Sequence, residues 1–334
     1  MMKRLLMIGL VLLFTVSTVF AGGQQESGEK GDGPMKVALL LSGPANDQGW
    51  NAVALQGLQE AEEKFGIETT YTEQVSIADS EAAYTDYASR GYDLIIGHGY
   101  QFGEPAVKVG ARFPNTNFMA IEANSQSENV ASYVIACEEA GYLMGYLAAS
   151  MSETGKLGIV GGIEQPSIVK ILEAYKLGAK NYDPSIEVYD VYIGSFTDVS
   201  LGKEAALSMA DKGADVLSHS ANQAGTGVIK AAQERGLMAT GDSWDQSSIA
   251  PDTVICSTIY SVPQLVLNAV EKVKNDNFEG GVFYQGMKEG VVDIAPYHGF
   301  EEKIDEEVKT KISEMKKQII DGSFDVPIIE EPTS

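Results

Sequence analysis

Short apolar runs alternate with amphipathic stretches along most of this chain. The first run, Lys36–Leu41, is bounded by Pro34 and Gly43 and predicts a buried strand. Residues 51–65 then place apolar side chains at helical spacing and stop at Gly66, a typical helix C-terminal signal. The pattern goes on to predict strands at 67–71, 93–96, 118–122 and 132–136 and helices at 82–90 and 103–113. Such alternation predicts a parallel sheet covered by helices on both faces.

The second half of the chain repeats this order. A basic-Gly-x-Asp turn feeds an apolar strand twice, as Arg90-Gly91-Tyr92-Asp93 and as Lys212-Gly213-Ala214-Asp215. In each copy a Gly-containing loop, a helix and a short strand follow, and the strand ends in an acid, Glu122 or Asp242. Two copies of one unit predict two α/β lobes with a ligand-binding cleft between them. Before the second copy of the turn, helices are expected at 141–151, 168–180 and 200–212 and strands at 157–160 and 187–193.

The segment after residue 253 is too short to form a lobe of its own. It predicts a strand at 254–260, a helix at 263–274, a short strand at 291–294 and a final helix at 302–321. We expect these elements to complete both lobes, so that the chain crosses between them more than once and forms a hinge. The expected first lobe is 35–135 with 258–282, and the expected second lobe is 136–257 with 283–330.

The N-terminus predicts export. Lys3 and Arg4 precede an apolar stretch, and Val19-Phe20-Ala21 forms a small-x-small cleavage site, so residues 1–21 indicate a signal peptide. Residues 22–34 are polar and rich in Gly, which is typical of a flexible leader. We expect a periplasmic or cell-surface protein, and no lipobox cysteine follows the cleavage site.

Composition narrows the possible partners. The chain has 334 residues, of which 44% are hydrophobic, enough for two domains with buried cores. Its formal net charge of −23 argues against nucleic acids and anionic membranes as partners. The two cysteines, Cys137 and Cys256, permit a disulfide near the hinge or two buried thiols, and the sequence leaves both open.

The loops after the predicted strands carry the candidate chemistry, because ligands of open parallel sheets bind beyond the carboxyl ends of the strands. Both tryptophans and many amides and acids lie there. Aromatic rings stack on flat or ring-shaped polar ligands, while amides and acids bond their edges, so nucleobases, nucleosides and sugars all fit. The candidate binding residues from these loops are Asp47, Trp50, Asn51, Tyr100, Glu122, Phe196, Asn222, Asp242, Trp244 and Asp245.

Other roles fit some of these residues. Asp47 also suits a helix N-cap, and Trp50 and Phe196 also suit core positions. His98 and His219 end matching strands and could hold a metal between the lobes, but packing or hydrogen bonding is the commoner role for such residues, so we expect no metal.

Catalytic motifs are missing from the sequence. It has neither a G-x-S-x-G elbow nor a P-loop lysine, so we expect neither an enzyme nor a cofactor. The Gly-rich turns after the strands lack Lys and Arg, which argues for an uncharged ligand over a phosphorylated one. A nucleoside hydrolase remains an alternative from another class.

An ordered set of motifs between Met35 and Phe300 resembles the basic membrane protein family of substrate-binding proteins, which serve ABC importers. The motifs are Asn46-Asp47-Gln48-Gly49-Trp50-Asn51, Gly97-His98-Gly99-Tyr100, Phe113-Pro114-Asn115-Thr116-Asn117-Phe118, Glu139-Ala140-Gly141-Tyr142-Leu143-Met144-Gly145 and Gly241-Asp242-Ser243-Trp244-Asp245-Gln246. The resemblance implies a type I periplasmic-binding fold, a purine nucleoside or base as ligand, an ABC permease as partner, and a monomer.

The resemblance also implies residue roles. Trp50 and Phe196 match the stacking rings, and Asp47 and Asn51 lie in the first binding loop. Glu122 stands where the family usually has an Asp facing the base, and either Asp242 or Asp245 resembles the ribose-binding acid. Tyr260, a further candidate binding residue, lies near a position where the family commonly has Lys, and many members have Phe where this chain has Trp50. These two departures keep a free base or a nucleoside open. A sugar-binding protein and a ligand-sensing receptor subunit remain alternatives.

Overall fold

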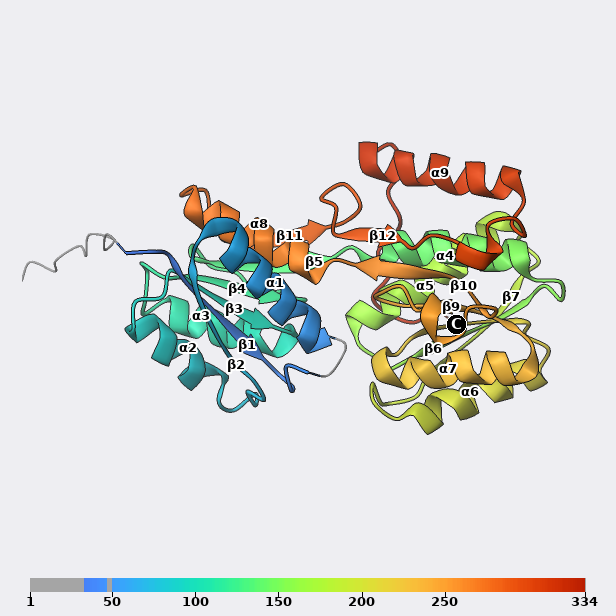
Figure 1. Cartoon of the computed structure of the whole chain (residues 1–334), viewed down its shortest axis with the longest axis horizontal. Coiled ribbons are helices and arrows are strands. Elements are labelled where there is room, and N and C mark those ends of the chain that lie inside the picture. The colour runs from blue at the N-terminus through green and yellow to red at the C-terminus, as the bar shows by residue number, and fades with distance from the viewer. Residues whose placement is uncertain (1–32, 47–49, 334) are drawn as a thin grey trace, which may run out of the picture. The chain divides into compact units, whose positions relative to one another are not determined.

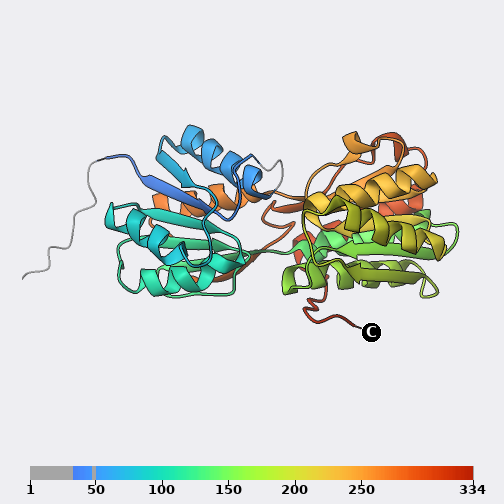
Figure 2. The same cartoon turned by 90° about the horizontal axis from the view of Figure 1, so that it is seen from below.

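The computed structural model describes residues 33–46 and 50–333. These residues form two α/β lobes, each built on a six-stranded sheet with helices on both faces (Figures 1 and 2). The expected signal peptide, nearly all of the expected leader and the candidate Asp47 lie outside the described residues.

The first lobe takes elements from the first part of the chain and two from near its end. In chain order these are β1 Lys36–Leu41, α1 Trp50–Phe65, β2 Glu68–Thr72, α2 Ser80–Ser89, β3 Leu94–His98, α3 Gly103–Gly110, β4 Asn117–Ile121, β5 Val130–Ile135, α8 Val262–Lys274 and β11 Gly281–Gln285.

The second lobe holds the remaining elements. They are α4 Cys137–Met151, β6 Lys156–Gly161, α5 Pro166–Tyr182, β7 Glu187–Tyr192, α6 Val199–Asp211, β8 Val216–Ser220, α7 Asn222–Arg235, β9 Met238–Gly241, β10 Val254–Tyr260, β12 Val292–Ile294 and α9 Glu306–Asp321.

The two sheets have corresponding strand orders. The first runs β2-β1-β3-β4-β5-β11 and the second runs β7-β6-β8-β9-β10-β12. The sequence repeat is therefore a repeat of topology. In both sheets the order reverses beside the first strand of the unit, β1 or β6, which is the point where α/β sheets commonly bind ligands.

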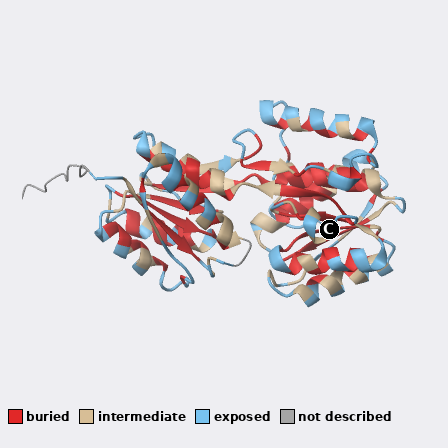
Figure 3. Cartoon of the chain, viewed as in Figure 1, coloured by how far each residue is buried: buried red, intermediate tan, exposed pale blue. Residues whose placement is uncertain are grey.

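The central strands are apolar because both of their faces are covered. Val37–Leu41 of β1 and all of β3 are buried, and Leu39 is paired in register with Ile96 (Figure 3). Although α8 follows β10 in the chain, it packs beside α1 in the first lobe (Figure 1). A parallel sheet enclosed in this way buries near-continuous hydrophobic runs.

The repeated basic-Gly-x-Asp turn has the same physical basis in both lobes. Gly91 and Gly213 adopt positive φ angles of 72° and 97°, which favour glycine. The acid two residues later then fixes a neighbouring segment by accepting backbone hydrogen bonds. Asp93 accepts from Lys36 N at 2.8 Å, and Asp215 accepts from Glu153 N at 2.7 Å.

The chain crosses between the lobes three times. The crossings lie between β5 and α4, between β10 and α8, and between β11 and β12. The second and third crossings follow Tyr260 and Gln285, whereas the sequence-based bounds were 257 and 282. Multiple crossings are present, as expected from the shortness of the final segment.

Two features of the sheets differ from the sequence prediction. The pattern predicted no strand at Gly281–Gln285, yet β11 pairs in parallel with β5 at the sheet edge, where its side chains are only partly buried. Such an edge strand lacks a long buried apolar run. In addition, β12 pairs antiparallel with β10, so the second sheet is mixed and not wholly parallel.

Two helix pairs of the second lobe approach to backbone contact. A Cβ added at Gly178 of α5 would lie 1.9 Å from the carbonyl oxygen of Tyr142 in α4, and one added at Gly145 of α4 would lie 2.0 Å from that of Tyr175. Gly202 and Gly227 play the same part between α6 and α7. Only glycine fits at these four positions without displacing the neighbouring helix.

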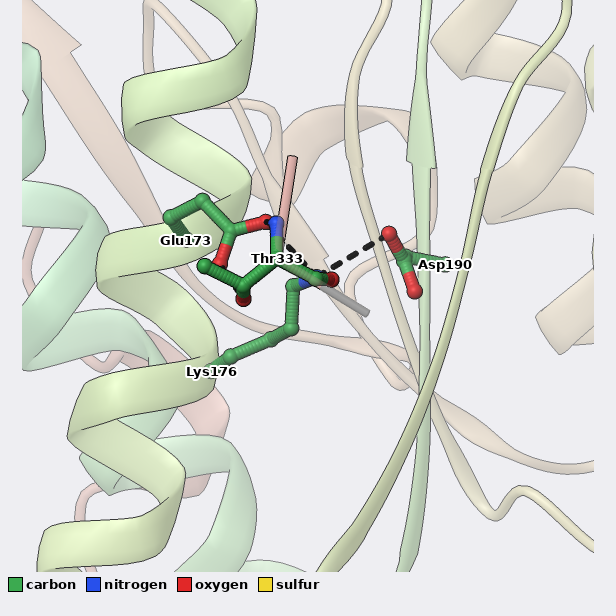
Figure 4. Close-up of polar contacts among 4 residues, drawn as sticks. All are labelled: Glu173, Lys176, Asp190 and Thr333. Carbon is green, nitrogen blue, oxygen red and sulfur yellow. Dashed lines mark hydrogen bonds and ion pairs between the residues drawn. The ribbon is translucent and has the colours of Figure 1, made fainter. Parts of the chain in front are cut away.

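The last described residue is anchored on α5 (Figure 4). Thr333 donates its backbone N–H to Glu173 Oε1 at 3.0 Å, and its hydroxyl bonds Glu173 Oε2. Lys176 Nζ lies 2.8 Å from Glu173 Oε1 and 3.1 Å from Asp190 Oδ2. The segment after α9 is also held by Phe324, whose ring centroid is 5.2 Å from that of Tyr142.

Candidate functional site

Trp50 lies at the point where the strand order of the first sheet reverses. It is the first residue of α1 and stacks on His98, the last residue of β3, with ring centroids 4.0 Å apart and planes 23° apart. His98 Nε2 lies 2.8 Å from the Trp50 carbonyl oxygen. His98 is fully buried, whereas Trp50 is only partly buried. The histidine therefore orients the indole and leaves part of it accessible.

Two other candidates of the first lobe have different surroundings. Asn51 is buried, and its Oδ1 accepts from Gly43 N at 3.3 Å, so it fixes the start of the loop after β1. Tyr100 is 68% exposed and begins the short 3-10 turn after β3.

Glu122 is turned toward the first crossing. It follows β4 with a φ of +59°, a conformation that costs a non-glycine residue energy and that often marks a functional position. Its Oε1 accepts from Ile135 N, at the end of β5, at 2.5 Å. Burial raises the pKa of Glu122, and nearby Lys170 opposes this shift. The structure thus places Glu122 against the crossing peptide.

A buried polar network surrounds Asp242 at the end of β9. Its carboxylate accepts hydrogen bonds from three hydroxyls, which are Thr258 Oγ1 at 2.9 Å, Ser243 Oγ at 3.0 Å and Ser220 Oγ at 3.4 Å. Burial raises the pKa of Asp242, while nearby His219 and the hydroxyl donors oppose the rise. The acid is therefore held in place by neutral donors.

His219 and Gln246 complete this network. His219 Nε2 lies 2.9 Å from Gln246 Oε1, and the same oxygen accepts from Asp242 N at 3.1 Å. Burial lowers the pKa of His219, so its ring is neutral at pH 7 and donates through Nε2.

Tyr260 ends β10 beside this network. Burial raises its pKa far above the ordinary value, and the nearby Asp242 carboxylate raises it further. The phenol consequently stays protonated and neutral at pH 7.

Phe196 lies in the loop after β7, packed on Gly162, which follows β6. A Cβ added at Gly162 would lie 2.3 Å from the Phe196 ring, and the Phe196 carbonyl accepts from Ala224 N at 3.0 Å. Because Gly162 has no side chain, the Phe196 ring packs directly against its backbone. Phe196 is only partly buried, so part of the ring remains accessible.

The remaining candidates of the second lobe lie nearer the surface. Asn222 is exposed at the start of α7, and Trp244 is 40% exposed. Asp245 Oδ2 lies 2.6 Å from His298 Nε2. Partial burial acts to raise the pKa of Asp245, but hydrogen bonds from Ser247 and His298 outweigh it and lower the pKa. Of the two acids that the motif left open, Asp242 is the buried one.

The structure places some of the candidate residues next to one another and others apart. It brings Asp242 and Tyr260 together in the second lobe, and in the first it pairs Trp50 with His98, which was not a candidate. The sequence reading missed the hydroxyl residues Ser220, Ser243 and Thr258. These residues lie at or near the ends of β8, β9 and β10. Ser and Thr are too common at such positions for the sequence alone to identify them as part of a site.

Three further features concern the cysteines, possible metal ligands and possible membrane helices. Cys137 and Cys256 are buried free thiols in this structure. Within residues 33–46 and 50–333, no group of three or more His, Cys, Asp or Glu side chains is arranged to hold a metal ion. A search of the same residues for a helix with the length and hydropathy of a membrane span found none.

Comparison with known proteins gives a consistent result. Residues 35–327 match the Bmp family model, described as "ABC transporter substrate-binding protein PnrA-like". The chain is similar to "Purine-binding protein BAB2_0673" of Brucella abortus, with 28% identity over 90% of this chain and 86% of the relative. It is also 28% identical to "ABC transporter nucleoside-binding protein BmpA" of Lactococcus lactis, over 98% of this chain and 99% of the relative.

A solved structure extends the similarity to the fold. An ABC transporter solute-binding protein from Aeropyrum pernix K1 has a TM-score of 0.77 and 26% identity, covering 88% of this chain and 94% of its own. The expected type I periplasmic-binding fold is thereby confirmed.

Proposed function

The chain belongs to the Bmp family of ABC transporter substrate-binding proteins, and from this premise we propose that it binds a purine nucleoside or purine base between its two lobes. Members of this family are exported proteins that bind a small molecule and serve a membrane permease. The names of two relatives, one purine-binding and one nucleoside-binding, support the choice of ligand.

The observation that carries the proposal is the buried Asp242 network. A carboxylate held by Ser220, Ser243 and Thr258, with Tyr260 beside it, offers oriented oxygens to a ligand that donates hydrogen bonds. Ribose hydroxyls and purine N–H groups are such donors. A phosphate or carboxylate on the ligand would be repelled by this acid.

Trp50 and Phe196 supply the stacking surfaces in the proposal. Trp50 follows β1 and packs on His98, whereas Phe196 follows β7 and packs on Gly162, just after β6. Both rings stay partly accessible. Purine rings stack on such surfaces for about 1–3 kcal/mol per base. The ligand bridges the two rings, so it favours the closed arrangement of the lobes by the contacts made only there.

A sugar is the second candidate ligand, because stacked aromatics with acids and amides also hold pyranoses. Signalling to a membrane receptor is the alternative to transport. We propose no catalytic activity, since the polar groups around Asp242 bond one another and include no activated nucleophile.

A thermal-shift titration tests the proposal. The protein is titrated with adenine, adenosine, guanosine, inosine, ribose and glucose, and we expect the melting midpoint to rise with purines in a concentration-dependent way. A rise with sugars alone would transfer the assignment to a sugar-binding protein. Release of free base from a nucleoside during the incubation would instead indicate a hydrolase.

A further inference from the structure

The backbone of Ile135, at the end of β5, is held from both lobes. Ile135 is the last residue of β5, and its N–H donates to Glu122 Oε1 at 2.5 Å. The carbonyl of the same residue accepts from Lys170 Nζ at 2.7 Å. Glu122 belongs to the first lobe, whereas Lys170 projects from α5 of the second. The first crossing therefore begins at a residue whose backbone N–H and C=O are each held by a charged side chain.

Lys170 is an unusual lysine in its burial. The residue is 2% exposed, and its ammonium lies 3.5 Å from Glu138 Oε2 of α4 and 5.8 Å from the ring centre of Tyr284 on β11. Burial alone would lower the pKa of Lys170, but Cys137, Glu122, Glu138 and Tyr284 together hold it above the ordinary value. A buried ammonium is costly unless it is paired and hydrogen-bonded, so its position is strongly constrained.

The surroundings of Lys170 link the crossing to the Asp242 network. Cys137, the first residue of α4, is buried, and its pKa is raised by burial, lowered by Lys170, and raised by the charges of Glu138, Glu122 and Asp242. Glu330, in the segment after α9, adds a further negative charge near Glu138.

We propose that Lys170 is a positioning residue of the hinge: it holds the Ile135 carbonyl while Glu122 holds the Ile135 N–H, and the two bonds together make the first crossing a stiff pivot. This inference rests on the proposed function for its relevance to ligand closure, but its structural part does not depend on any ligand. With the pivot stiff, the free protein keeps a narrow range of lobe orientations. Ligand binding then spends less free energy on ordering the lobes.

The test compares variants of the whole protein without ligand. Lys170→Met removes the ammonium but leaves Glu138 buried and unpaired, so the decisive variant is the double change Lys170→Met with Glu138→Gln, which removes both charges. Lys180→Met is the matched control, because Lys180 lies on the same helix with an exposed side chain whose ammonium bonds Pro184 O. Amide hydrogen exchange of Ile135 and of the buried strand β8 is measured in each.

We expect Ile135 to exchange at least tenfold faster in the double variant while β8 keeps its wild-type rates, and we expect no change in the control. Glu122→Gln is a nearly isosteric change at the acid that accepts from the Ile135 N–H, and it should also speed exchange at Ile135. This variant keeps the test possible if the double variant does not fold. Unchanged exchange at Ile135 in either folded variant would overturn the proposal.

A second arm measures binding. For whichever compound of the purine panel binds the wild type, we expect an affinity loss of at least threefold in the double variant and none in the control. If the wild type binds no purine, the proposed function fails while the exchange experiment still decides the role of Lys170. Faster exchange with unchanged affinity would refute the stiff-pivot role in binding.

Discussion

The sheet edges where we propose that the ligand binds share a topology in the two lobes but differ in how they are built. In the first lobe the main candidate is an aromatic pair, Trp50 on His98. In the second lobe the main candidate is Asp242, buried and bonded by hydroxyls from three different segments. One edge offers a face for stacking, and the other offers oriented polar atoms.

This difference indicates a division of labour. Stacking tolerates many flat ligands and contributes affinity, whereas a buried acid with fixed neighbours rejects ligands that leave it unpaired. A repeated unit can thus keep its fold in both copies while only one copy carries the selective chemistry. The predictions below separate the two roles.

The largest expected effect is on the polar edge. Asp242→Asn should lower affinity for the preferred purine about 100-fold, or about 2.7 kcal/mol, because hydrogen bonds to a charged acceptor are lost. Calorimetric titration measures this, with the exposed Asp252→Asn as control. A loss no greater than that of the control would remove Asp242 from the site.

The same variant separates binding from stability. Because the folded-state pKa of Asp242 is raised, its ionised form costs folding free energy at pH 7, and this cost is relieved as the pH falls through the raised pKa. The ligand-free Asn variant should therefore melt no lower than the wild type at pH 7, with the difference shrinking at acid pH. A clearly lower midpoint at pH 7 would mean that Asp242 mainly stabilises the fold.

The next largest effect is expected on the packing of α4 against α5 in the second lobe. Gly178→Ala should lower the free energy of unfolding by about 2–3 kcal/mol, because the added Cβ overlaps the Tyr142 carbonyl. Gly299→Ala is the matched control, since its nearest neighbour, Pro251 O, would lie 3.8 Å away. Urea unfolding of both variants gives the comparison, and equal stabilities would contradict the close packing of α4 on α5.

The stacking edge should give an effect of about 1–3 kcal/mol. Trp50→Ala is expected to weaken purine binding by this amount, while Trp50→Phe should retain most of the affinity because it keeps a ring over the ligand. Quantitative thermal shift or calorimetry distinguishes them. If the alanine variant binds as tightly as the wild type, the stacking role of Trp50 is lost.

The smallest effect belongs to the partly exposed pair of Asp245 and His298. Asp245→Asn should reduce stability at pH 7 by less than about 1 kcal/mol, since a partly exposed hydrogen-bonded pair contributes little. The pKa of Asp245 is lowered in the folded state, so its contribution is present at neutral pH and disappears as the pH falls through that pKa. Melting curves at pH 7 and at acid pH check both points, and a large drop in purine affinity would instead place Asp245 in the site.

The sequence predicted much of the fold because its strongest signals are local. The buried runs of β1 and β3 and the amphipathic pattern of α1 all lie within a residue or two of their predicted bounds. The edge strand β11 was missed because partly buried side chains carry no clear alternation. The antiparallel β12 depends on how the chain returns between lobes, which no local pattern encodes.

The candidate site was less predictable because it depends on contacts between distant segments. The motif could not choose between Asp242 and Asp245, and only burial separates them in the structure. The burial of Lys170 could not be predicted from the sequence, because a lysine on a predicted amphipathic helix usually faces solvent. Glu122 was predicted as a ligand-facing acid, and its bond to Ile135 became evident only from the fold, so its contact with ligand remains a prediction.

The reciprocal glycines of α4 and α5 bear on how this protein would move. Side-chain layers between helices allow one helix to slide along another by small rotamer changes, which is the basis of shear motion. Backbone atoms in direct contact offer no such layer, so the α4–α5 pair resists sliding. The second lobe would then rotate as a rigid body. When the strand ends near the proposed ligand site rotate, the outer helices would rotate by the same angle.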